Sequence, residues 1–275
     1  MRRGRFLVGL VVALVSVIGY YSVRQTNPIT GQTQHIALTH DQEIALGVQS
    51  APEMAAQFGG LDPDPSIQAD VAAIGQRVVR VSVAGTTDYQ FSFHVLRDPE
   101  TVNAFALPGG PIFITRGLLN RLENEAELAG VLGHETGHVI ARHSAAQIAK
   151  SRLAQGLVVA VGAAGSDDGS GGRHAAQVAA VVAQMVQLKY GRGDEIQADT
   201  LGVRLMSEAG YDPRAMIELM RILEQSGSGE RPPEFMSSHP DPGNRRGIID
   251  QAIRTRFPSG VPEQLTLGRR IKLSS

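Results

Sequence analysis

The chain has 275 residues, enough for one large domain or two small ones. Its net charge of −1 gives no electrostatic basis for binding nucleic acid, so we expect no nucleic-acid partner. Because the sequence contains no cysteine, disulfides, cysteine zinc ligands and lipid-modified cysteines are excluded. Any zinc ion must therefore be held by histidine, aspartate or glutamate.

An apolar run from Phe6 to Val23 follows three arginines near the N-terminus. At about eighteen residues, it is just long enough to cross a bilayer as a helix. An uncleaved signal anchor and a cleaved signal peptide both explain it. No clear Ala-x-Ala cleavage site follows, and Tyr20 and Tyr21 suit the aromatic belt at a membrane surface, which favours the anchor. The arginines would keep the N-terminus in the cytoplasm, so in a bacterium the rest would be periplasmic.

The next segments predict a linker and then several helices. Residues 24–37 are polar and contain proline and glycine, which is typical of a linker. Apolar residues recur at helical spacing over residues 39–54 and again over 67–79. Further along, residues 145–164 and 174–189 are rich in small apolar side chains and predict a helical hairpin.

Three short strands are predicted between these helices. Tyr89–Leu96 alternates apolar and polar residues, and Asn103–Leu107 and Pro111–Thr115 flank a Pro-Gly-Gly turn. The expected fold class is therefore mainly α with a small β-sheet (α+β). The edge of the strand at Asn103 could pair with an extended peptide, although a purely structural hairpin explains the same pattern.

The strongest motif is His134-Glu-Thr-Gly-His138, which lies in a segment with helical periodicity. Asn124, three residues before Glu127, predicts a capped start of this helix. On a helix, His134 and His138 lie one turn apart on one face and can bind one zinc ion. Glu135 lies about 100° around the helix, where its carboxylate can reach a water on the metal. This HExxH arrangement predicts two zinc ligands and a general base.

Two ordinary histidines beside a solvated glutamate are the alternative to a metal site. The flanking residues are mostly Leu, Val, Ile, Ala and Gly, which favours burial, and buried histidine and glutamate need partners such as a metal. We place His143 on the same helix, nine residues beyond His134. It would point to nearly the opposite side, and we exclude it as a ligand.

Glu195 and Asp199 lie one turn apart in a second predicted helix, which runs from Tyr190 to Gly210. A catalytic zinc takes three protein ligands and leaves a fourth position for water. Glu195 is the best candidate for the third ligand. Asp199 could accept a hydrogen bond from a ligating histidine and fix its tautomer. A solvated acidic helix face explains the same spacing.

The segment from His239 to Arg245 contains two prolines and predicts a stiff turn. His239 could pack there as a structural residue, or it could occupy the open zinc position and hold an enzyme latent. Residues 227–229 and 231–233, rich in Gly and Pro, would let such a loop move. His239 and Arg245 are also candidates for stabilising an oxyanion.

Taken in order, these motifs resemble the HtpX-, BepA- and CaaX-prenyl-protease-like zinc metallopeptidases, which are gluzincins. The bacterial periplasmic BepA/LoiP-like branch is the nearest. The resemblance runs from about Leu38 to Ala252 and rests on residues 43–47, 103–110, 117–119, 134–143, 192–199 and 238–242. Gly191, where the family usually has serine, and Gln197, where it often has glutamate, depart from the pattern without affecting a proposed ligand.

The resemblance implies roles for individual residues. His134, His138 and Glu195 match the family's zinc ligands, with one Zn²⁺ per chain. Glu135 matches its catalytic base, and Asp199 matches the acidic residue one turn beyond the third ligand. The segment at Asn103 is similar to its substrate-side strand.

We therefore expect a zincin-like metallopeptidase domain at residues 38–255. It would follow an anchor or signal peptide (1–23) and a linker (24–37) and precede a tail (256–275). The expected activity is zinc-dependent endopeptidase cleavage of extended or unfolded polypeptides, in misfolded or unassembled proteins of the bacterial cell envelope. The alternatives are a membrane-anchored chaperone or assembly factor with a latent zinc site, and a metallohydrolase for non-peptide amides. A prenylated-peptide protease would need more than one spanning segment to enclose its substrate.

Overall fold

The computed structural model describes residues 2–165, 190–226, 234–240 and 243–271. The chain divides into two compact units, one comprising residues 1–39 and 142–188 and the other residues 40–141 and 189–275. The described residues are mainly helical, as the sequence predicts, and contain two small sheets where the sequence predicts one. The second helix of the hairpin expected at 174–189 lies outside them.

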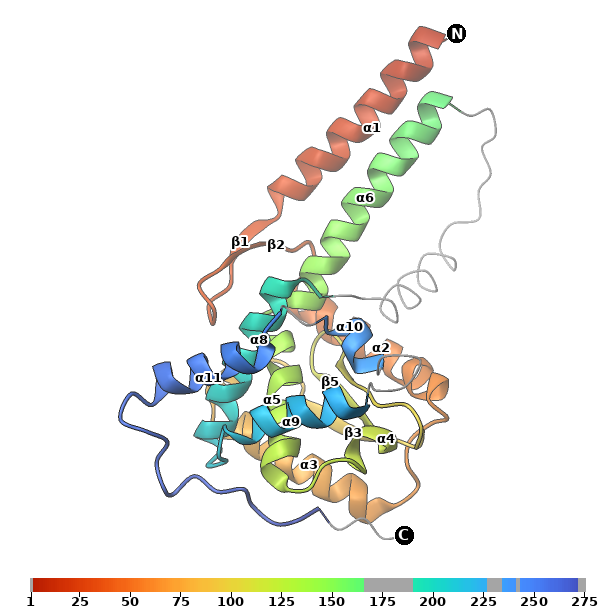
Figure 1. Ribbon diagram of the computed structural model, residues 1–275. Helices are drawn as coiled ribbons and strands as arrows, with labels where there is room; N and C mark the ends of the chain where they lie inside the picture. The colour runs from red at the N-terminus through yellow and green to blue at the C-terminus, as the bar shows by residue number, and fades with distance from the viewer. Residues whose placement is uncertain (1, 166–189, 227–233, 241–242, 272–275) are drawn as a thin grey trace. The chain divides into compact units, whose positions relative to one another are not determined.

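The first unit contains α1 (Arg2–Ser22) and α6 (His143–Gly165), which lie side by side (Figure 1). Gly156 of α6 faces Ser16 of α1 so closely that a Cβ atom would not fit between them. Among the helices that the structure describes, none combines the length and apolarity needed to cross a membrane. The anchor expected at Phe6–Val23 therefore stays a prediction.

The segment expected to be a linker contains a short antiparallel pair, β1 (Arg24–Thr26) and β2 (Thr33–His35). The turn between them is built by Asn27, whose Oδ1 accepts the backbone N–H of Ile29 at 2.8 Å and of Thr30 at 3.0 Å. Proline and glycine indicate this turn in the sequence. The strands escape detection because each has only three residues, too few to show alternation.

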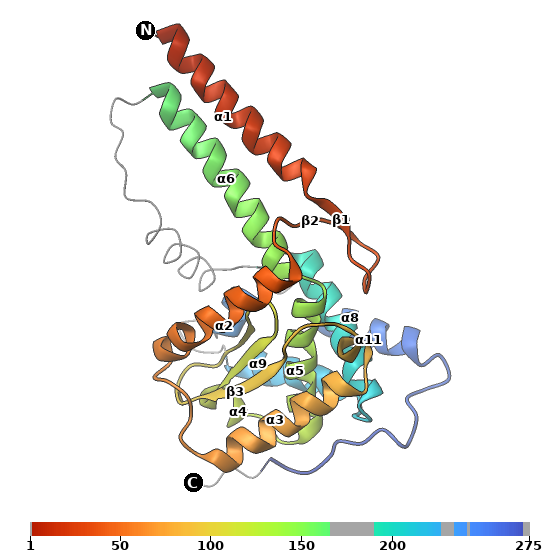
Figure 2. The ribbon, with the colours of Figure 1, turned by 180° about the vertical axis from the view of Figure 1, so that it is seen from behind.

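The second unit is built around α5 (Glu125–Ile140), in which every residue from Ala126 onward is buried. Helix α3 packs against it on the side nearest the viewer in Figure 2, whereas α9 crosses in front of it in Figure 1 and α8 runs beside it. The other helices of the unit are α2 (His40–Gln57), α3 (Pro65–Arg80), α4 (Arg116–Leu119), α8 (Arg192–Glu208), α9 (Ala215–Ser226), α10 (Glu234–Ser238) and α11 (Arg245–Arg256), with a 3₁₀ turn at Val83–Thr86.

The sheet of this unit has the order β3-β5-β4. Its strands are β3 (Ser92–Leu96), β4 (Ala104–Ala106) and β5 (Pro111–Thr115). The Pro-Gly-Gly turn between β4 and β5 agrees with the prediction, with Gly109 and Gly110 at φ 80° and 130°. The strand predicted from residue 89 begins only at Ser92, because its pairing with β5 extends no further. β4 is an edge strand, and no other described strand lies on its outer side.

Both ends of α5 are defined by specific contacts. Asn124 caps the start as predicted, with Oδ1 accepting the N–H of Glu127 at 3.1 Å and Nδ2 donating to its carboxylate at 2.9 Å. At the other end the prediction is wrong, because α5 stops at Ile140 and His143 opens α6. Arg142 between them has φ 60°, a left-handed conformation that interrupts helical hydrogen bonding.

The tail also supports the start of α5. The carbonyls of Leu267 and Arg269 accept the N–H groups of Ala126 and Glu125, both at 3.0 Å. These N–H groups lie in the first turn, where a helix offers them no internal partner. Residues of the expected tail therefore supply hydrogen-bond acceptors to the first turn of the helix that carries the HExxH motif.

Three glycines bring α5 and α8 together. A Cβ atom on Gly133 would lie 3.3 Å from the carbonyl oxygen of Gly202, and one on Gly137 would lie 3.2 Å from that of Ala198. A Cβ on Gly202 would lie 3.2 Å from the backbone N of His134. Side chains here would push the backbones apart. This glycine contact sets the distance between the HExxH motif and the first turns of α8.

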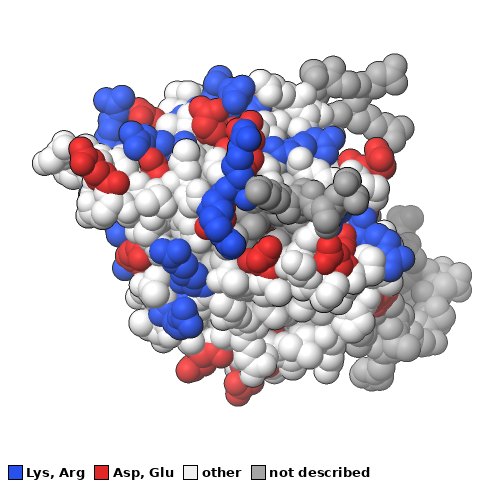
Figure 3. Space-filling model, turned by 90° about the horizontal axis from the view of Figure 1, so that it is seen from below, with Lys and Arg blue, Asp and Glu red and all other residues white. Residues whose placement is uncertain are grey.

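Charged side chains of both signs are interspersed on the face of the molecule in Figure 3. Exposed ion pairs of the second unit include Arg254 with Asp250 at 2.8 Å and Arg221 with Glu218 at 2.7 Å. Such pairs each contribute about 0–1 kcal/mol. These exposed ion pairs therefore contribute little to the stability of this unit.

Candidate metal centre

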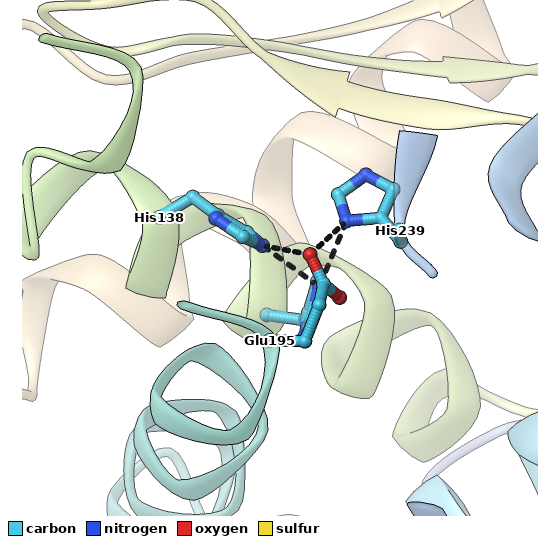
Figure 4. A group of neighbouring side chains, drawn as sticks. His138, Glu195 and His239 are labelled. Atoms are coloured by element: carbon cyan, nitrogen blue, oxygen red, sulfur yellow. Dashed lines mark hydrogen bonds and ion pairs between the residues drawn. The ribbon is translucent and has the colours of Figure 1, made fainter. Parts of the chain in front are cut away.

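Three histidines and one glutamate converge inside the second unit. His134 and His138 come from α5, Glu195 comes from the first turn of α8, and His239 follows α10 directly. One ligand atom of each lies within 4.8 Å of the others, and all four residues are buried. Figure 4 shows His138, Glu195 and His239 directed at a common point, each from a different segment. The structure thus brings together the three predicted ligands and adds His239.

The separations among these atoms fit a zinc ion. Nε2 of His134 lies 3.0 Å from Nε2 of His138 and 3.3 Å from Nδ1 of His239. The carboxylate oxygens of Glu195 lie 3.4 Å from His134 Nε2, 3.5 Å from His138 Nε2 and 3.1 Å from His239 Nδ1. Ligand atoms at tetrahedral corners about 2.0–2.1 Å from zinc would be roughly 3.3 Å apart. Three imidazoles and a carboxylate are also the donor types that zinc prefers.

Asp199 and Arg245 contact the cluster through hydrogen bonds and ion pairs. Oδ1 of Asp199 lies 2.9 Å from Nδ1 of His134, which leaves Nε2 of that ring directed at the other ligands. Arg245, the first residue of α11, donates to the same carboxylate from Nε and from Nη2, each at 2.8 Å. Its Nη2 also lies 3.3 Å from Oε2 of Glu195. Both residues are therefore linked to the ligands by hydrogen bonds and ion pairs.

The carboxylates of Glu195 and Asp199 dominate the electrostatics around His134. Burial by itself lowers the pKa of His134, but its bonds to Asp199 and Glu195 outweigh burial and raise that pKa to about 9. Burial opposes ionisation of Glu195, yet the charges of His239 and the bond from His134 bring its pKa well below the usual range. The pKa of Asp199 is lowered too, because Arg245 and His134 offset its burial. Two ionised carboxylates therefore face the imidazoles.

Glu135 lies beside the cluster and is fully buried. Neither of its carboxylate oxygens has a hydrogen-bond partner in the described part of the chain. Burial raises its pKa, an effect that His239 and His134 only partly offset. Its Oε1 lies 3.6 Å from Nε2 of His239. A buried carboxylate with no donor is costly, and this one is positioned to accept a proton from a molecule bound at the cluster.

The remaining predicted residue, Asn103, is buried immediately before β4, where its N–H donates to Oγ1 of Thr115 at 3.1 Å. It is not part of the cluster. The glycine- and proline-rich segments expected to move with His239, at 227–229 and 231–233, lie outside the residues that the structure describes. The role of each residue as ligand, base or substrate contact stays a prediction.

Two aromatic residues at the site were not predicted from the sequence. The ring of Tyr190 stacks on His138 with centroids 3.9 Å apart, and that of Phe235 stacks on His239 at 4.4 Å. Tyr190 immediately precedes the Gly-Arg-Gly-Asp-Glu sequence, which is the one signal that could have indicated its position. Phe235 lies three residues before the Ser-His-Pro-Asp-Pro motif, but no pattern of its own marks it.

Comparison with known proteins shows the family of the chain. Residues 65–252 match the family described as Peptidase family M48. The chain is 32% identical over 253 residues to the mitochondrial metalloendopeptidase OMA1 of Schizosaccharomyces pombe, covering 91% of this chain and 72% of that protein.

Two bacterial relatives carry the name β-barrel assembly-enhancing protease. The one from Yersinia pestis is 30% identical over 246 residues, covering 87% of this chain and 49% of that protein. The one from Escherichia coli K12 is 29% identical over 226 residues, covering 80% and 45%. The chain spans about half the length of these two relatives. The family expected from the sequence is confirmed, and this chain belongs to peptidase family M48 as a metalloendopeptidase.

Proposed function

We propose that this metalloendopeptidase uses one zinc ion to cleave misfolded or unassembled polypeptides of the bacterial cell envelope. The observation that carries the proposal is the convergence of His134, His138 and Glu195 beside the buried carboxylate of Glu135. Bound there, zinc would polarise the peptide carbonyl and lower the pKa of water to about 7.

The residues of the chain then have distinct tasks. His134, His138 and Glu195 are the proposed ligands. Glu135 takes a proton from the attacking water and returns one to the leaving amine. Asp199 fixes the tautomer of His134. The two bonds from Arg245 to Asp199 support a positioning role for Arg245 over contact with an oxyanion.

We propose in addition that His239 holds the enzyme latent. A catalytic zinc needs three protein ligands and one open position. The short distances from His239 Nδ1 to His134 and Glu195 support a fourth bond to the metal, which would exclude water. The same observation favours the second candidate function, an assembly factor whose zinc site stays latent. A purely structural His239 is the alternative to both.

The proposed location rests on the N-terminal sequence. We propose that residues 6–23 anchor the chain in the inner membrane and that the following residues are periplasmic. The apolar run, the three preceding arginines and the tyrosine pair support this. The substrate is proposed to be an extended polypeptide that pairs with the edge of β4 near Asn103.

Replacing Glu135 by Gln should abolish cleavage without loss of metal. We expect the zinc-loaded full chain in detergent to cleave casein, and Glu135→Gln to be at least about 100-fold slower, because no general base remains. Zinc content should be equal in both proteins by mass spectrometry. The exposed Glu100→Gln is the matched control and should retain wild-type activity. Zinc in both proteins with cleavage by neither would favour the assembly-factor function.

Replacing Asp199 by Asn should weaken zinc binding about 10- to 100-fold, because His134 loses the anion that fixes its ring. Competition with a fluorescent zinc chelator measures this affinity. Asp194→Asn removes an equal charge from the same helix and should change the affinity less than about twofold. Equal affinities for the two variants would contradict the role of Asp199.

Replacing His239 by Ala should open a metal position. If the open state is populated at about a tenth or less, cleavage of a short fluorogenic peptide should rise about tenfold or more. His94→Ala, a half-buried histidine outside the cluster, serves as the control. Latency through His239 is wrong if the activity of His239→Ala is at or below that of wild type.

The anchor predicts that the chain stays with bacterial membranes after alkaline carbonate extraction, whereas a chain beginning at residue 24 is released. N-terminal sequencing of the membrane-bound protein should find residues 1–5 intact. Recovery of a product that begins near residue 24 would instead establish a cleaved signal peptide.

A further inference from the structure

The two helices of the first unit pack against each other through small side chains. Helices α1 and α6 lie side by side, with the start of α1 next to the end of α6, so they are antiparallel (Figures 1 and 2). The contact between Ser16 and Gly156 identifies the facing sides. By helical spacing Gly9 and Ala13 share the side of Ser16, and Ala160 shares that of Gly156; none of the five is exposed. Close approach through small residues is typical of helix pairs in lipid.

The large apolar side chains of the pair point the other way. In a helix pair that is stable in water, such side chains would face each other. Here Val158 is 72% exposed and Val15 is 63% exposed. The exposed large apolar residues include Leu10, Leu14 and Val15 on α1 and Leu157, Val158 and Val159 on α6. Their outer surface is continuous with the anchor proposed for residues 6–23, and exposed apolar surface of this kind marks an interaction site.

Polar groups along this part of the pair are few. Oγ of Ser16 donates to the carbonyl of Val12 at 2.8 Å, so the hydroxyl is satisfied within its own helix, as a lipid environment requires. In the sequence of α6 from Leu153 to its end at Gly165, the one polar side chain is Gln155.

Charged and aromatic side chains begin at one level of the pair. Arg152 lies four residues from Gly156, and Tyr20 lies four residues from Ser16 in the same direction, so both are about 6 Å along the helices from that contact. Lys150 and Arg152 are exposed. The ring of Tyr20 stacks on His35 with centroids 4.3 Å apart. Tyrosine and the long basic side chains are the residues that sit at a membrane surface.

We propose that α6 enters the lipid bilayer beside α1, with Lys150 and Arg152 at the level of anionic headgroups. From Leu153 to Gly165 the helix covers about 20 Å, less than the roughly 30 Å of the hydrocarbon core. It therefore enters the bilayer without crossing it. This inference rests on the anchor in the proposed function and adds a second segment of the chain that contacts lipid.

The inference also narrows the substrate class. Fourteen positions separate His138 from Arg152. Even a fully extended chain of this length spans only about 50 Å, so connectivity alone keeps the proposed ligand close to the headgroups. The polypeptides that reach the metal centre are then those at the membrane surface.

The test uses the absence of cysteine, because a single introduced cysteine becomes the only site for a thiol-reactive bimane fluorophore. Three exposed valines are compared in the full chain: Val158→Cys on α6, Val15→Cys on α1, and Val48→Cys on α2 as the control in the second unit. Each protein is reconstituted into vesicles of phosphatidylethanolamine with about a quarter phosphatidylglycerol. Quenching is measured with aqueous iodide and with nitroxides attached to the acyl chains.

We expect iodide to quench Val158→Cys at least about fivefold less than Val48→Cys, because an anion does not enter hydrocarbon. Acyl-chain nitroxides should quench Val158→Cys and Val15→Cys but not Val48→Cys. The depths of the first two labels should agree within about 3 Å, because Val158 and Val15 lie nearly level in the antiparallel pair. Val159→Cys, at the next exposed position, replaces Val158→Cys if that variant does not fold.

The remaining outcomes separate this inference from the proposed anchor. Quenching of Val15→Cys by nitroxides, with Val158→Cys open to iodide, would retain the anchor and overturn the entry of α6. Protection of Val158→Cys from both quenchers would show a face covered by protein and would overturn it too. If Val15→Cys and Val158→Cys both behave like Val48→Cys, the anchor fails and the inference fails with it.

Discussion

The metal chemistry of this chain depends on how closely α5 and α8 approach each other. Gly133 and Gly137 on one helix and Gly202 on the other leave no space for side chains between the backbones. This contact brings Glu195 within 3.4–3.5 Å of the HExxH imidazoles. Two of the five HExxH positions, His134 and His138, therefore bear proposed ligands, and a third, Gly137, lies in the close contact between the two helices.

Support for the cluster extends outward from that contact. Asp199, one turn along α8, orients His134, and Arg245 at the start of α11 holds Asp199 with two bonds. Helix α10 carries Phe235 and leads directly into His239, whose ring stacks on that of Phe235. The residues that surround the HExxH motif in space thus come from segments that follow it in sequence.

The sequence predicts well what is encoded locally. Helical spacing indicates the pair His134 and His138, and the cap at Asn124 depends on residues three positions apart. Glu195 could be identified because a second acidic residue follows one turn later. The end of the helix before Arg142 could not be predicted, because its left-handed φ of 60° does not alter the spacing of apolar residues in the sequence. Contacts such as that of Phe235 with Val102 depend on chain segments brought together only by folding, and no local pattern reports them.

The proposed ligand set would also give a bound metal a thermodynamic role. His134 and His239 lie 105 positions apart, and Glu195 and His239 lie 44 apart. A metal held by these residues joins distant parts of the chain, so it binds the folded state and scarcely the unfolded one. Its binding would then add RT ln(1 + [L]/Kd) to the unfolding free energy, where [L] is the free metal concentration. This is about 2.7 kcal/mol when [L] is 100 times Kd. The lifetime of the protease in its compartment would therefore follow the free zinc concentration there.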